Sequence, residues 1–167
     1  LWAHIQTIYS ELGVPASEQL PKLTLLDIVK PGKAPELETK AATCRYFCRQ
    51  GILSTLTSAH NFDTGTSLQK AIHKVATFTT QVYQHVEAFN GRKLAKYGRA
   101  LKSQYMALES HIQREDENDV CSWHAKPKWH LAEHIFDLAW EGHNPKDFWN
   151  YRDETFASSM QQWALRR

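Results

Sequence analysis

Residues 67–114 decide the fold, and they read SLQKAIHKVATFTTQVYQHVEAFNGRKLAKYGRALKSQYMALESHIQR. Apolar residues recur here every three or four positions, the spacing that places them on one face of a helix. The pattern predicts two long helices, at 67–90 and 92–114. In the first helix, the predicted inward face consists of Leu68, Ile72, Val75, Thr79, Val82, Val86 and Phe89.

Turn-forming and capping residues set the expected ends of these helices. Thr66 or Ser67 can cap the start of the first helix, and Asn90-Gly91 is expected to end it in a left-handed turn. Upstream, residues 36–60 follow helical spacing as well. We expect one helix there that continues through Gly51, because a single glycine weakens a helix without necessarily breaking it.

The amino-terminal region predicts a short helix followed by an irregular connector. Residues 2–12 place Ile5, Ile8 and Tyr9 on one face, and Gly13 is a glycine stop. Residues 14–36 hold four of the six prolines. Prolines lack a backbone donor and bias the preceding residue away from the helix, so this segment is expected to be irregular.

The carboxy-terminal region, residues 127–167, predicts a helical hairpin. Pro127 suits the first turn of a helix that ends at Gly142. Asn144 can cap a second helix, with Pro145 at its first position. The fold expected for residues 1–167 is therefore a single-domain, all-α bundle of five to six helices with a proline-rich connector near its start.

Composition narrows the class of protein further. The chain has 167 residues, a formal net charge of +2 and three cysteines. An odd, small number of cysteines does not build a disulfide framework, so we expect free thiols in a reducing, intracellular compartment, the nucleus included. No apolar run approaches the roughly 20 residues of a membrane span. The chain begins with Leu1, and a fragment of a longer protein is the expectation.

A stripe of basic residues runs along the second long helix, and we call it the basic stripe. Its members recur about every three residues along one helix: Arg92, Lys93, Lys96, Arg99 and Lys102. Such a stripe can follow the phosphates of a nucleic acid. A solvated helix face has the same pattern, so this interpretation stays open beside the first.

Two histidines lie one helical turn apart, His130 and His134, and could reach one metal ion. With Glu133 they spell His-x-x-Glu-His, formally the motif of inverzincin peptidases. Those enzymes need a third, distant ligand and an α/β scaffold, which this chain lacks. Packing of both rings against Trp123 and Trp129 is the alternative without a metal.

Further residues could complete a divalent-metal site around this histidine pair. Cys121 and His124 supply the ligand types of structural zinc, although the gap that contains Pro127 is short for a zinc finger. From the expected last helix, Asp153 or Glu154 is predicted to approach one of the histidines. The outcome expected there is a hydrogen bond to a packed imidazole, with metal ligation as the alternative.

The block from about residue 124 to residue 156 resembles the terminal block of transposase-derived open reading frames. Those frames typically read Pro-Lys-x-His-x-x-x-His, a Gly-Pro-like turn and then Trp-x-x-x-x-Glu. This chain has Asn144-Pro145 at the turn and Trp149 five positions before Glu154. The resemblance implies that Glu154 corresponds to the last metal-binding acid of an RNase H-like core. No strand-borne aspartates precede it, so the chain is not expected to catalyse strand transfer alone.

Three functions follow from these observations. The first is a non-catalytic helical fragment or domesticated remnant of a mobile-element protein, which binds nucleic acid or a protein partner. The second is a helical structural subunit of a larger assembly, with its six tryptophans and six tyrosines as interface anchors. The third is a metal-binding helical module centred on His130 and His134. Binding of DNA or RNA that depends strongly on salt would distinguish the first from the second.

Overall fold

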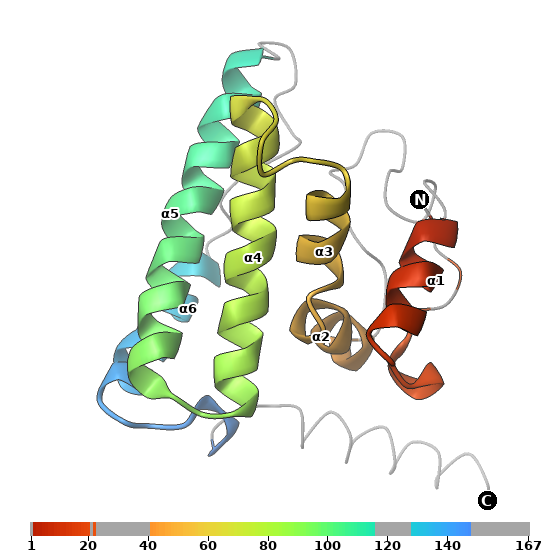
Figure 1. The fold of residues 1–167 in the computed structure, drawn as a ribbon. Coiled ribbons are helices and arrows are strands. Elements are labelled where there is room, and N and C mark those ends of the chain that lie inside the picture. The colour runs from red at the N-terminus through yellow and green to blue at the C-terminus, as the bar shows by residue number, and fades with distance from the viewer. Residues whose placement is uncertain (1, 21, 23–40, 116–127, 148–167) are drawn as a thin grey trace, which may run out of the picture.

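The computed structural model describes residues 2–20, 22, 41–115 and 128–147, and across these ranges it contains helices and no strand (Figure 1). The α-helices are α1 (Trp2–Glu11), α2 (Ala41–Arg49), α3 (Ile52–Ala59), α4 (Ser67–Glu87), α5 (Gly91–Glu115) and α6 (Lys128–Trp140). Two short 3₁₀ helices are η1 (Ala16–Glu18) and η3 (Pro145–Asp147). The all-α prediction is therefore confirmed.

Two parts of the predicted architecture lie outside the described residues. They are most of the proline-rich connector and the part of the carboxy-terminal hairpin that follows residue 147. The first residues of the expected second helix are described and form η3. The division of the chain into a single domain stays a prediction. None of the described helices has the length and hydrophobicity required to cross a membrane.

The long antiparallel pair α4 and α5 forms the centre of the bundle. Helices α2 and α3 pack against α4 on one side, and α1 packs against α3 beyond them. Helix α6 packs against α5 on the other side of the pair (Figure 1). Each long helix is thus covered on two sides rather than one.

Two groups of buried apolar side chains lie on opposite sides of α4. The amino-terminal core consists of Ile5, Ile8, Tyr9, Val14, Leu20, Phe47, Ile52 and Leu56. The carboxy-terminal core consists of Val86, Leu94, Ala95, Phe136 and Ala139. The first core joins α1, α2 and α3, and the second joins α4, α5 and α6.

The single helix expected over residues 36–60 is wrong, because Gly51 breaks it into α2 and α3. Gly51 has a φ of +72°, in the left-handed region that glycine adopts without steric cost. Its N–H donates to the Cys48 carbonyl at 3.1 Å, which closes α2. Its own carbonyl accepts from the Thr55 N–H at 2.9 Å, which opens α3.

The left-handed conformation expected at Asn90-Gly91 is also wrong. The Asn90 N–H does donate to the His85 carbonyl in the last turn of α4, at 3.2 Å, but the two residues then begin α5. The Asn90 side-chain oxygen accepts from the Lys93 N–H at 3.1 Å, as a capping residue does. Positive φ occurs elsewhere in the described chain, and Asn90 and Gly91 do not have it. At the other end of α4 the predicted cap is confirmed: Thr66 forms a reciprocal capping box with Gln69.

The predicted inward face of α4 is only partly correct. Val86 is buried, whereas the other predicted positions are half-buried. The remaining buried residues of α4 are Ala71, Ala76 and Thr80, which the periodicity did not select. Helix α4 has neighbouring helices on two sides, so a single apolar stripe does not describe its buried surface. Small side chains such as alanine are also buried where a neighbouring helix lies close.

Candidate nucleic-acid interface

The candidate interface depends on the close packing of α6 against α5. Small residues recur along the contact face of α5, at Gly91, Ala95 and Gly98. A Cβ atom at position 98 would lie 2.5 Å from Cδ1 of Phe136, and one at position 91 would lie 3.0 Å from the carbonyl carbon of Ala139. The absence of side chains at these two glycines therefore lets α6 approach α5 closely.

This approach brings carboxylates of α6 to two members of the basic stripe. Arg99 donates to Asp137 at 2.7 Å, and Lys102 donates to Glu133. The side chains of Arg99 and Asp137 are 52% and 59% exposed, so water screens this pair. Lys102 is half-buried beside its carboxylate, and it contributes less to the exposed positive surface than the sequence suggested.

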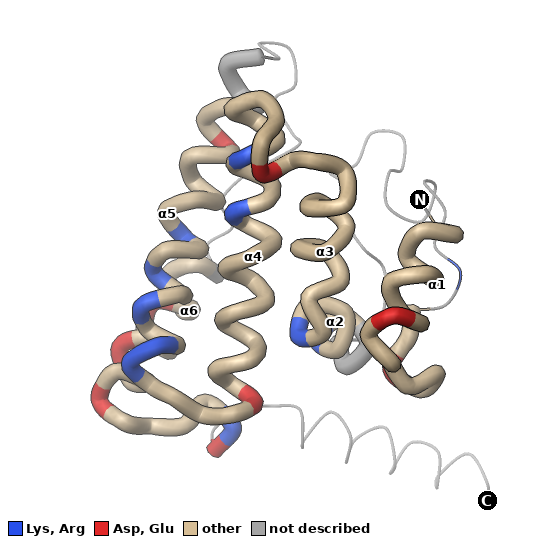
Figure 2. Tube along the Cα trace, viewed as in Figure 1, with Lys and Arg blue, Asp and Glu red and all other residues tan. Residues whose placement is uncertain are grey.

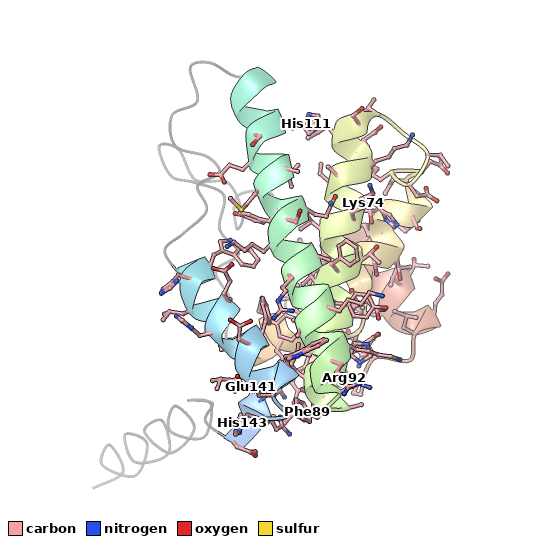
Figure 3. All side chains as sticks on the ribbon, turned by 90° about the vertical axis from the view of Figure 1, so that its left-hand side faces the viewer. Lys74, Phe89, Arg92, His111, Glu141 and His143 are labelled. Atoms are coloured by element: carbon pink, nitrogen blue, oxygen red, sulfur yellow. The ribbon has the colours of Figure 1, made fainter. Side chains whose placement is uncertain are left out.

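The other part of the stripe surrounds a hollow at the amino-terminal end of α5. The hollow has a volume of about 540 Å³, and we call it the basic hollow; its lining is Arg92, Lys93, Lys96, Arg99 and Trp140. Figure 2 shows the basic residues gathered along this half of α5. In Figure 3, Arg92 lies at the same end of the bundle as Glu141 and His143, and His111 lies at the opposite end of α5.

Trp140 gives the basic hollow an aromatic wall. It is the last residue of α6, and its side chain is 53% exposed. The guanidinium carbon of Arg99 lies 5.7 Å from the centre of its ring, within the range of a cation–π contact. The hollow thus combines positive charge with an exposed aromatic surface, the two features of sites that bind single-stranded nucleic acid.

Three cations of the basic hollow have no counter-charge within the described chain. Arg92, Lys93 and Lys96 form no ion pair with a carboxylate of a described residue. The first turn of α5 also lacks an acidic residue. Cations near a helix amino terminus oppose the helix dipole, so this arrangement costs local stability and raises the positive potential at the hollow.

His85 of α4 borders Lys93 and adds no charge to this surface. Its ring stacks on Tyr97, with ring centres 5.5 Å apart and an angle of 10° between the planes. Burial lowers the pKa of His85, and the positive charge of Lys93 lowers it further. The imidazole is therefore neutral at pH 7, and the lysine and arginine side chains carry the local charge.

The predicted metal-site residues divide into described and undescribed positions. His130 and His134 are both exposed, with their Nε2 atoms 3.2 Å apart. Of the two tryptophans expected beside them, Trp129 contacts Tyr105, with ring centres 5.3 Å apart, and Trp123 lies outside the described residues. The other residues named for this site lie outside the described residues: Cys121, His124, Asp153 and Glu154. Within the described ranges, no three metal-binding side chains gather around one point.

A separate thiol pair lies on α2, at the helical spacing seen in the sequence. A hydrogen bond from Cys48 lowers the pKa of Cys44 to about 7, with burial as the smaller, opposing effect. The same hydrogen bond raises the pKa of Cys48, and burial raises it further. Both thiols are free, as expected, and Cys44 is the more acidic of the two.

The sequence identified the cations of the interface but not its aromatic wall. Trp140 was not selected, because nothing in its immediate sequence shows which helix α6 contacts. The small residues Gly91, Ala95 and Gly98 were the available signal, since they mark a helix face that another helix can approach closely.

Comparison with protein-family models, with curated proteins and with solved structures gave no match for this chain. The resemblance to transposase-derived frames therefore stays a prediction.

Proposed function

We propose that this chain is a non-catalytic helical module that binds single-stranded nucleic acid at the basic hollow. The observation that supports this function best is the arrangement of Arg92, Lys93 and Lys96 beside the exposed ring of Trp140. Lysine and arginine neutralise backbone phosphates, and an aromatic ring provides a stacking surface for a base.

The ion pair between Arg99 and Asp137 fits this role. Because both side chains are more than half exposed, exchange of the carboxylate for a phosphate costs little. Arg99 can then contact a phosphate while its guanidinium stays over Trp140. The pair keeps the arginine positioned when no nucleic acid is bound.

An origin in a mobile-element protein is compatible with this proposal and rests on the resemblance of residues 124–156 alone. The proposal does not depend on that origin. The proposal depends on the positive charge of α5 and the aromatic surface of α6. A protein of any origin could use these two features to bind a single strand of nucleic acid.

The test is the salt dependence of binding to a fluorescent single-stranded oligonucleotide, measured by anisotropy. In the triple variant Arg92→Gln/Lys93→Gln/Lys96→Gln, affinity should fall for all sequences. The slope of log affinity against log salt should decrease by about two units, since each lost phosphate contact removes about 0.7.

The matched control is Lys22→Gln/Lys70→Gln/Lys74→Gln, which removes the same charge from three exposed lysines outside the stripe. Its slope should stay close to that of the unmodified chain. If affinity and salt slope fell equally in both variants, binding would depend on the net charge of the chain and not on the basic hollow. Binding that does not depend on salt would contradict the proposal and favour the structural-subunit function.

A further inference from the structure

The pair His130 and His134 on α6 has the geometry of a two-ligand metal site. Their Nε2 atoms are 3.2 Å apart, their ring centres are 4.5 Å apart, and the ring planes meet at 77°. Both side chains are exposed, so the edge that carries these nitrogens is open to solvent. A hydrogen bond, with the N–H of one ring donating its proton to the nitrogen of the other, accounts for this contact.

The same separation suits replacement of that proton by a metal ion. For metal–nitrogen bonds of about 2.05 Å, two nitrogens at this separation subtend about 100° at the metal, close to a tetrahedral angle. A small rotation about the terminal torsion of each side chain directs both lone pairs to a common point, and this torsion is broad for histidine. Because neither ring is packed, little opposes that rotation.

The surroundings determine the class of metal. The nearest acids in sequence, Glu133 and Asp137, are engaged by Lys102 and Arg99 of α5. The described residues therefore offer two imidazole nitrogens and no carboxylate to the ion, with water in the remaining positions. Imidazole favours zinc, nickel, copper and cobalt, whereas magnesium and calcium require oxygen ligands.

We infer that His130 and His134 form a bidentate site for a borderline divalent transition metal on the exposed surface of α6. The site is independent of the basic hollow, because none of its ligands lines that hollow. Metal binding connects two successive turns of α6. It therefore stabilises this helix by an amount that grows with the logarithm of the ratio of the metal concentration to the dissociation constant.

The experiment is a titration of the full chain with nickel chloride, followed by NMR of the histidine ring protons. Paramagnetic broadening should affect His130 and His134 before the other histidines. His130→Ala and His134→Ala should each lower the nickel affinity at least tenfold. Alanine favours the helix and both rings are exposed, so these variants should retain the circular dichroism of the unmodified chain.

The matched control is His143→Ala, which removes another exposed histidine and should leave the affinity unchanged. Magnesium chloride at the same concentrations should neither broaden these resonances nor displace nickel. No preferential broadening of His130 and His134, or equal affinity in all three variants, would overturn the inference. Since oligonucleotide binding is measured separately, failure here leaves the proposed function intact.

Discussion

Gly98 of α5 faces the ring of Phe136 of α6, and a Cβ atom at position 98 would lie 2.5 Å from Cδ1 of that ring. Phe136 is only 6% exposed, so its ring has little space to move away. This relationship fixes the separation of the two helices. It also fixes the position of Trp140 beside the cations of α5.

We expect Gly98→Ala to destabilise the protein although alanine favours a helix. The added methyl group overpacks the contact at a cost of about 1–3 kcal/mol, against a gain of about 1 kcal/mol in helix propensity. The free energy of unfolding from urea denaturation should therefore fall. In a protein that already carries Phe136→Leu, the ring is absent, and Gly98→Ala should therefore cost less stability than it does in the unmodified chain. A more stable Gly98→Ala protein would contradict this account of the contact.

Trp140→Ala should weaken binding of a single-stranded oligonucleotide with little effect on stability. Loss of a stacking surface typically costs about 1–3 kcal/mol of binding free energy, or roughly tenfold in affinity. The side chain is 53% exposed, so the midpoint of urea denaturation should change little. Leu131→Ala is the control, because Leu131 is 62% exposed on the same helix and lies outside the hollow. Equal effects of the two substitutions on binding would remove Trp140 from the interface.

Stability should decrease at alkaline pH in a way that depends on Tyr9. Burial raises the pKa of Tyr9 above its ordinary value of 10.0, with the hydrogen bond from the Leu20 N–H as a smaller, opposing effect. The folded chain therefore holds this proton more tightly than the unfolded chain, and stability falls as pH rises through 10.0. Urea denaturation at several pH values should show a shallower alkaline decline for Tyr9→Phe. Tyr105, whose pKa is also raised, is present in both proteins and does not affect their difference. Parallel declines would exclude Tyr9 as a source of the effect.

Cys44 should react with iodoacetamide faster than Cys48 near neutral pH. Only the thiolate is nucleophilic, and Cys44 has a pKa of about 7 whereas that of Cys48 is raised. In Cys48→Ala the hydrogen bond is lost. The pKa of Cys44 should then rise towards that of a free thiol, and its reaction at pH 7 should slow by about tenfold. Peptide mapping by mass spectrometry measures both rates. Faster labelling of Cys48 than of Cys44 would contradict this assignment.

Local periodicity was enough to predict α1, α4, α5 and α6, because each is bounded by a capping residue or a glycine stop. It did not predict the break at Gly51. The same residue can be tolerated inside a helix or can adopt a positive φ, and the surrounding tertiary contacts decide between these outcomes. For the same reason, Asn90-Gly91 allowed both a helix stop and a helix start.

The candidate site shows the same division between local and tertiary information. A one-dimensional spacing located the cations of α5 and both histidines of α6. The pairing of Arg99 with Asp137 and the place of Trp140 depend on how two helices approach each other, which no local pattern specifies. The small residues Gly91, Ala95 and Gly98 indicate that another helix packs closely on this face of α5. They do not indicate that this helix is α6.

The carboxylate of Glu87 helps to couple the two cores of the bundle. At the end of α4, one oxygen lies 3.6 Å from Nη1 of Arg45 on α2, and the other accepts from Nζ of Lys146 in η3 at 3.0 Å. A single side chain thus joins the helices around the amino-terminal core to the segment that follows α6. Loss of that link should reduce the cooperativity of unfolding. In Glu87→Gln, backbone amides of the two cores should exchange with solvent as separate units.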